Sequence, residues 1–142
     1  MKYHHITFLI VLGWIVFVGL TSPLSATEPY VLSVQQLKAG MEKSAQPSQK
    51  GFILVDVRTP EEHAGGFIPG TDFNIDFREM QFRHLELHAN LDEHIVVYCQ
   101  SGHRSSIAAE TLTDLGYNFV YNVAGSMNAW QEAGYPIEMP RR

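Results

Sequence analysis

A short apolar run passes into a polar loop at residues 95–105, which read Ile95-Val96-Val97-Tyr98-Cys99-Gln100-Ser101-Gly102-His103-Arg104-Ser105. The pattern predicts a buried strand over Ile95–Tyr98, then a loop, then a helix over Ser105–Leu115 that is closed by Gly116. In α/β sheets, ligands bind outside the carboxyl ends of the strands. Cys99 is therefore expected to lie where chemistry takes place.

Cys99 is the only cysteine of the chain. A lone cysteine is more often a small buried hydrophobe than a nucleophile. Here a glycine, an arginine and a serine follow it closely. Backbone N–H groups at a helix start and a neighbouring guanidinium both favour the reactive thiolate. We therefore interpret Cys99 as the nucleophile, with Gly102 supplying a permissive backbone and Ser105 capping the helix.

Strands and helices alternate along the rest of the chain. The predicted strands are Phe52–Val57, Asp72–Ile75 and Phe119–Val123. The predicted helices are Ser33–Met41, a short one opened by Thr59, Pro60 and Glu62 and stopped by Gly65 and Gly66, the longest one over Asp76–Asn90, and Ser126–Ala133. Ser33 with Gln36, and Thr59 with Glu62, have the spacing of capping boxes. The alternation predicts an α/β domain with a mainly parallel sheet and helices on both faces.

The N-terminus has the layout of a secretory signal. Lys2 precedes the apolar run Ile6–Leu20, and Leu24-Ser25-Ala26 offers a cleavage site. We expect residues 1–26 to be removed and residues 27–142 to form one domain, exported to a bacterial periplasm. An uncleaved N-terminal anchor stays open as the alternative, and only in that case would the chain contact a membrane.

Removal of residues 1–26 would leave 142 − 26 = 116 residues, with nine Lys plus Arg against fifteen Asp plus Glu, a formal charge of 9 − 15 = −6. An acidic chain without a basic stripe is a poor candidate for nucleic-acid binding. One cysteine in an exported chain forms no internal disulfide, so it must be free, modified or paired with another molecule.

Four segments together resemble the single-domain rhodaneses, and the resemblance covers Tyr30 to Met139. The segments are Asp56-Val57-Arg58-Thr59-Pro60-Glu61-Glu62, Gly66-Phe67-Ile68-Pro69-Gly70, Tyr98-Cys99-Gln100-Ser101-Gly102-His103-Arg104-Ser105, and Asn122-Val123-Ala124-Gly125-Ser126 with Trp130. The resemblance implies a five-stranded parallel sheet flanked by helices. It also implies transfer of a sulfane sulfur through a cysteine persulfide, and no cofactor or metal is expected.

The implied mechanism has two steps. The Cys99 thiolate takes the outer sulfur of a donor, either thiosulfate or a persulfide, and the resulting persulfide passes that sulfur to a thiol or to cyanide. The loop residues expected to surround the sulfur are Gln100, Ser101, Gly102, His103, Arg104 and Ser105. Arg104 would either neutralise the donor or tie the loop to an acidic neighbour. His103 would either lower the pKa of the cysteine or simply be exposed.

Other polar residues have structural interpretations. Asp56 and Arg58, at the end of the first long strand, are expected to form an ion pair that supports the site. His84 and His88 have the spacing of a metal pair but are interpreted as solvated. In this chain Phe67 replaces the histidine usual in the family, and His63 stands where an aromatic residue is common. Ser101 stands where classical two-domain enzymes have a basic residue, so thiosulfate is expected to be a poor donor.

Three alternative functions remain at this point. A cysteine phosphatase or arsenate reductase would need its arginine as the sixth residue after the cysteine, whereas Arg104 is the fifth. A sulfur carrier or interaction module would use the fold without turnover. A thiol redox partner would form mixed disulfides through Cys99 but would lack a resolving cysteine.

Overall fold

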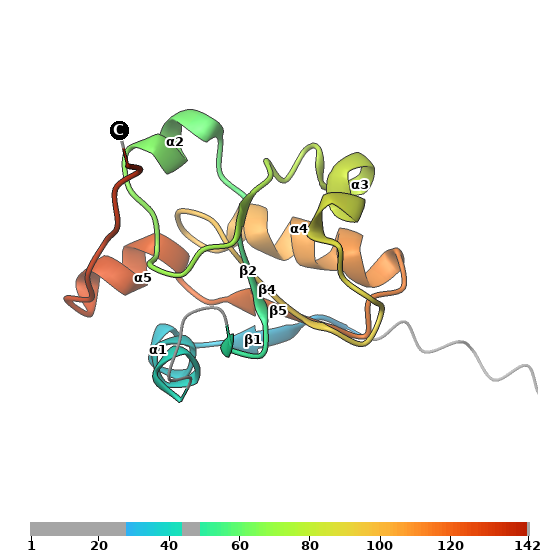
Figure 1. Cartoon of the computed structure of the whole chain (residues 1–142), viewed down its shortest axis with the longest axis horizontal. Coiled ribbons are helices and arrows are strands. Elements are labelled where there is room, and N and C mark those ends of the chain that lie inside the picture. Colours follow the sequence, from blue (N-terminus) through green and yellow to red (C-terminus); the bar gives the residue numbers. More distant parts are fainter. Residues whose placement is uncertain (1–27, 44–48, 142) are drawn as a thin grey trace, which may run out of the picture.

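The computed structural model describes residues 28–43 and 49–141, which form one α/β domain (Figure 1). All strand pairs of the five-stranded sheet are parallel, and the strand order is β1-β5-β4-β2-β3. The strands are β1 Tyr30–Leu32, β2 Ile53–Asp56, β3 Phe73–Asn74, β4 His94–Tyr98 and β5 Phe119–Val123. The predicted α/β class and the five parallel strands are confirmed. Periodicity missed β1, because three residues at a sheet edge are too short for a pattern.

Helices cover both faces of the sheet, as predicted. The helices are α1 Val34–Glu42, α2 Pro60–Ala64, α3 Met80–Arg83, the 3₁₀ helix η2 His84–Leu87, α4 His103–Asp114 and α5 Ser126–Glu132. Figure 1 shows α1 and α5 on one side of the molecule and α3 and α4 on the other. Alternate residues of β4 supply the two cores: Val97 packs with α3 and α4, whereas Val96 packs with α1 and α5. A strand covered on both faces needs continuous apolar sequence, which β4 has.

Local capping signals place two helices as predicted. Ser33 and Gln36 form a complete capping box at the start of α1. Thr59 and Glu62 form another at the start of α2, which ends at Gly65. α2 lies at the carboxyl end of β2, so its first turn reaches the edge of the sheet where β4 also ends. The second of these boxes therefore positions an acidic side chain near the loop after β4.

The predicted long helix over Asp76–Asn90 is wrong. The chain there forms a turn, the four-residue α3 and the 3₁₀ helix η2, which ends at His88 with a φ of 50°. The Asp76 carboxylate accepts from the backbone and the guanidinium of Arg78, so it stabilises a turn instead of capping a helix. Met80 and Leu87 are both buried, but the tighter η2 turn, not a continuous α-helix, places Leu87 in the core. Within residues 28–43 and 49–141, the longest helix is α4.

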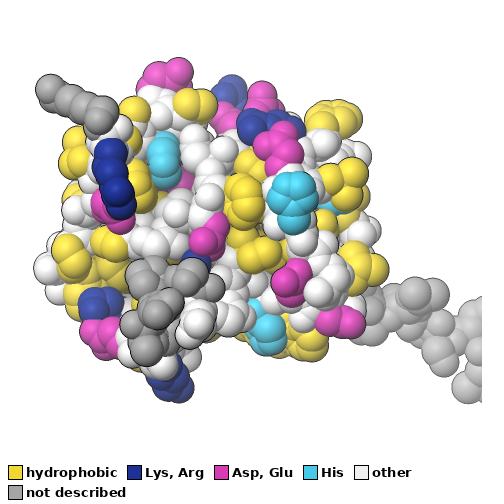
Figure 2. All heavy atoms as spheres, in the orientation of Figure 1, with side chains coloured by type: hydrophobic (Ala, Val, Ile, Leu, Met, Phe, Trp, Pro, Cys, Tyr) yellow, Lys and Arg dark blue, Asp and Glu magenta, His cyan; other side chains and the backbone are white. Residues whose placement is uncertain are grey.

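The predicted signal segment, residues 1–26, lies outside the residues that the structure describes. Within residues 28–43 and 49–141, no helix has the length and apolar character needed to cross a bilayer. Figure 2 shows acidic and basic side chains interspersed over the visible face, without a broad basic area.

Candidate active site

Cys99 follows the last residue of β4 and is fully buried in the floor of a loop. The loop turns back at Gly102, whose φ of 103° lies in the region that glycine adopts most readily. A Cβ on Gly102 would come within 3.3 Å of the Gly125 backbone nitrogen, so the loop also packs tightly against the start of α5. Both requirements explain why a glycine occupies this position.

Helix α4 begins at His103, with Gly102 as its N-cap, so the prediction that Ser105 caps the helix is wrong. The positive φ of Gly102 lets the helix start two residues earlier than expected. Ser105 consequently sits in the first turn, where it is fully buried and faces the sulfur. It contributes to the site through its hydroxyl rather than through a cap.

Hydrogen-bond donors surround the Cys99 sulfur. The Gly102 N–H donates to Sγ at 3.1 Å, and the Ser105 hydroxyl lies 3.4 Å from Sγ. The same hydroxyl donates to the Asn122 Oδ1 at 2.6 Å, and Asn122 Nδ2 donates to the Gly102 carbonyl at 3.3 Å. Because a hydroxyl has one hydrogen, Ser105 can turn from Asn122 to a sulfur that has become negative.

These donors make the thiol more acidic. Burial raises the pKa of the Cys99 thiol, but the Ser105 hydroxyl and the N–H groups of Ser105, Gly102 and Ser101 lower it by more, so its pKa lies below the usual value. A buried anion surrounded by N–H groups is the arrangement that stabilises a thiolate. The loop can therefore hold a reactive sulfur anion at neutral pH more readily than free cysteine can.

Helix α5 orients the loop from the other side. The Met127 N–H donates to the Cys99 carbonyl at 3.1 Å, and the Asn128 N–H donates to the Gln100 carbonyl at 2.9 Å. The Ser126 hydroxyl accepts from the Cys99 N–H at 3.1 Å. With their carbonyls bound to α5, the loop peptides leave their N–H groups free to face the sulfur. Asn122 and Ser126 were quoted in the resemblance but were given no role, and only their position at the carboxyl end of β5 could have indicated one.

Arg104 is bound to an acidic neighbour, one of the two arrangements expected for it. Its Nη1 and Nη2 donate to the two carboxylate oxygens of Glu62, each at 2.7 Å. Glu62 is held in place because its Oε2 also accepts from the Thr59 N–H at 3.1 Å. The guanidinium lowers the pKa of Glu62 to about 2, so the carboxylate is charged at any physiological pH. The ion pair joins α2 to the first turn of α4.

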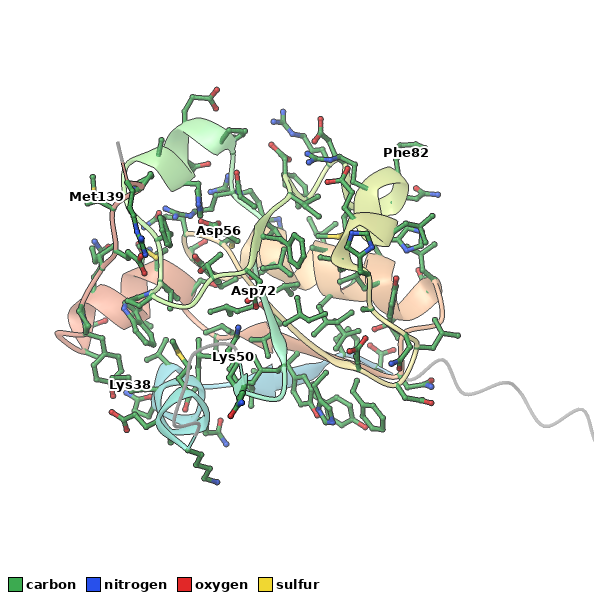
Figure 3. All side chains as sticks on the ribbon, viewed as in Figure 1. Lys38, Lys50, Asp56, Asp72, Phe82 and Met139 are labelled. Carbon is green, nitrogen blue, oxygen red and sulfur yellow. The ribbon has the colours of Figure 1, made fainter. Side chains whose placement is uncertain are left out.

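Asp56, which is labelled in Figure 3, forms a second ion pair with Arg58, and both side chains are buried. Arg58 also donates to the Gly66 carbonyl at 2.7 Å and approaches the Gln100 side chain at 3.4 Å. Through Gln100, the pair therefore supports the loop. His63 contacts the same carboxylate at 3.0 Å and stacks on Phe67, with ring centroids 4.3 Å apart. The two residues that depart from the family pattern, His63 and Phe67, thus pack together beside Asp56.

Among the described residues, the hydrogen bonds to the sulfur come from Gly102 and Ser105, and none comes from a histidine. His103 is exposed at the start of α4, and Ser101 is exposed in the loop. His84 contacts the Tyr117 hydroxyl at 3.0 Å, and His88 follows η2, so the two do not share an α-helical face. Across residues 28–43 and 49–141, no group of three or more His, Cys, Asp or Glu side chains could hold a metal ion.

Comparison with known proteins identifies the family of the chain. Residues 33–133 match the family model described as the rhodanese-like domain. The chain is 39% identical over 88 residues to a protein named sulfurtransferase from Allochromatium vinosum, covering 62% of this chain and 79% of the relative. It is 32% identical over 97 residues to the thiosulfate sulfurtransferase GlpE of Stutzerimonas stutzeri, covering 63% and 78%.

A solved structure shares the fold as well. The human single-domain sulfurtransferase TSTD1 superimposes with a TM-score of 0.60 and 30% sequence identity, over 72% of this chain and 95% of that chain. The matched family region contains β2, β4, β5 and the cysteine loop, which are the elements that build the site. The chain belongs to the rhodanese-like domain family.

Proposed function

We propose that this protein is a sulfurtransferase that carries a sulfane sulfur on Cys99. The thiolate attacks the outer sulfur of a donor such as thiosulfate, the donor's S–S bond breaks, and sulfite leaves with the bonding electron pair. The enzyme then holds a persulfide anion, which an acceptor thiolate or cyanide attacks at its outer sulfur, and the Cys99 thiolate is regenerated.

One observation carries the proposal: hydrogen-bond donors converge on a buried sulfur at the end of a central strand. Preorganised N–H groups stabilise negative charge without reorganising during the reaction. The persulfide is also an anion. The same donors can therefore serve both the resting enzyme and its intermediate.

Sulfur transfer is supported over phosphoryl chemistry by the position of the arginine. A phosphatase needs a guanidinium free to bind several phosphoryl oxygens, whereas both terminal nitrogens of Arg104 are bound to Glu62. The names of the sulfurtransferase relatives point the same way. We further propose that the protein acts after export to the periplasm, and mapping of the mature N-terminus would test cleavage after Ala26.

The test is intact mass after incubation with thiosulfate. We expect wild-type protein to gain the mass of one sulfur atom, to lose it when cyanide is added, and to release thiocyanate in equal amount. Cys99→Ser should stay folded and gain nothing. A carrier without turnover would gain the sulfur atom but would not pass it to cyanide, and a thiol redox partner would not gain a single sulfur atom from thiosulfate. Either result, or hydrolysis of a chromogenic phosphate ester without persulfide formation, would contradict the proposal.

A further inference from the structure

The arginines around the cysteine loop share one feature, which is that each is already bound to a carboxylate. Arg58 is bound to Asp56, Arg104 to Glu62 and Arg78 to Asp76. In each pair, two guanidinium nitrogens donate to the carboxylate. Pairs of this kind have no net charge and leave few donors for an incoming anion.

Of these pairs, the one between Glu62 and Arg104 is placed to act on a donor. Arg58 is buried with its partner, and Arg78 lies on the exposed turn after β3. Arg104 is in the first turn of α4, next to Ser105, whose hydroxyl lies 3.4 Å from the Cys99 sulfur. Its side chain is 26% exposed and that of Glu62 is 34% exposed, so both members of the pair are accessible to solvent and to a dissolved donor.

Glu62 is also fixed independently of Arg104. It is the third residue of α2, and its carboxylate accepts from the Thr59 N–H while its own N–H donates to the Thr59 hydroxyl. A carboxylate held by a capping box presents its oxygens in one orientation. Arg104 is therefore bound to a preformed acceptor rather than pairing with a mobile side chain.

We propose that Glu62 sets the charge of the sulfur donor, by neutralising Arg104 and occupying its donors, so that donors with one negative charge are favoured over dianionic thiosulfate. This inference rests on the proposed function. The favoured class comprises persulfides and thiosulfonates, in which one negative charge accompanies the transferable sulfur. Their reaction is balanced as before: the Cys99 thiolate takes the outer sulfur, and a thiolate or sulfinate leaves with the bonding pair.

Two donors of different charge allow a direct test. Thiosulfate is a dianion, and methanethiosulfonate is a monoanion in which a methyl group replaces one oxygen. The energy of a donor in the field of the site scales with the donor's charge. If removal of one charge from the site changes kcat/KM for the monoanion by a given factor, it should change kcat/KM for the dianion by the square of that factor. The ratio of the two values of kcat/KM therefore reports the charge of the site. A loss of reactivity at Cys99 lowers both values by the same factor and leaves the ratio unchanged.

The variants are Glu62→Gln, Arg104→Gln and the double variant, with cyanide as acceptor. Glutamine at position 62 can keep the cap but lacks the charge. We expect the thiosulfate-to-methanethiosulfonate ratio to rise about 2-fold in Glu62→Gln, and to fall about 2-fold in Arg104→Gln, for charges roughly 8 Å apart in water. The double variant has the same net charge as the wild type, so its ratio should return to the wild-type value.

The matched control is Glu61→Gln, which removes the neighbouring exposed carboxylate of α2 and should change the ratio less than Glu62→Gln does. A ratio that is unchanged in both single variants, or that moves in the same direction in both, would overturn the inference. Absence of a persulfide with either donor would overturn the proposed function and this inference with it, so the two failures are distinguishable.

Discussion

Arg58 binds the carboxylate of Asp56 through three of its N–H groups, at a point where both side chains are buried. The backbone N–H and Nε donate to Oδ1 at 3.0 Å, and Nη2 donates to Oδ2 at 2.6 Å. Arg78 repeats this geometry on Asp76, but its side chain is 67% exposed. The described part of the chain therefore contains the same local motif twice, once with both side chains buried and once with a buried carboxylate and an exposed arginine.

Because the two pairs share one geometry, removing the carboxylate from each should show how burial of the arginine affects the free energy of unfolding. Asp56→Asn would leave the Arg58 guanidinium buried without its counter-charge, so the free energy of unfolding should fall by about 3–5 kcal/mol. Asp76→Asn should cost less than about 1 kcal/mol, because Arg78 remains hydrated. Urea unfolding of both variants measures the difference, and equal losses would show that burial does not govern these pairs.

Ser105→Ala should make Cys99 less reactive. The variant removes the Ser105 hydroxyl, the largest of the contributions that lower the pKa of the thiol, so that pKa should rise. Since a hydrogen bond to a charged group contributes about 1.5–3 kcal/mol, alkylation by iodoacetamide at pH 7 should slow about tenfold. Ser106→Ala is the control, because the Ser106 hydroxyl bonds the His103 carbonyl away from the sulfur. An unchanged alkylation rate in Ser105→Ala would show that the backbone N–H groups alone lower the pKa of the Cys99 thiol.

Gly102→Ala should distort the cysteine loop. Its φ of 103° is unfavourable for alanine, and the new Cβ would lie 3.3 Å from the Gly125 nitrogen. We expect a loss of about 1–3 kcal/mol in the free energy of unfolding and much slower alkylation of Cys99. Gly134→Ala provides the comparison, since that glycine has a φ of 73° but open space around the added Cβ. It should lower stability without changing the alkylation rate.

The Glu62–Arg104 pair should make the folded protein less stable as the pH falls below 4.5. The pKa of Glu62 is lowered from 4.5 to about 2 in the folded protein, so its contribution is complete above pH 4.5 and is lost as the pH falls toward 2. The difference in Tm between wild type and Glu62→Gln should therefore be constant from pH 7 to pH 5 and should narrow below pH 4.5. Thermal unfolding followed by circular dichroism measures this, and a difference that grows in acid would contradict the pairing.

Local rules explain which elements could be predicted from the sequence. The capping boxes at Ser33 and Thr59 depend on residues three apart, so spacing alone identified them. The strand ending at Tyr98 was recognisable because it is apolar throughout. The segment after Asp76 was misread because its apolar spacing fits both a continuous helix and the turn that the structure contains. The choice between them depends on tertiary packing of Leu87, which no local pattern encodes.

The residues of the site also divide into those that a local sequence pattern indicates and those that the tertiary fold brings together. Cys99, Gly102 and Arg104 are close in sequence, so one loop pattern indicated all three. Asn122 reaches the site because β5 pairs with β4 in a register that aligns it with Val97. The pairing of Glu62 with Arg104 depends on how α2 sits over the sheet. Strand register and helix placement are products of the whole fold, so these partners could not be derived from the loop alone.

The bonds from α5 to the carbonyls of Cys99 and Gln100 have a consequence for the newly made chain. The last strand and last helix are synthesised after the cysteine, and they supply Asn122, Ser126 and the amides that turn the loop. Until they fold, the thiol is flanked by an unconstrained backbone and has ordinary acidity. The protein therefore acquires the enhanced acidity of its single sulfhydryl only when the last strand and the last helix have folded against the cysteine loop.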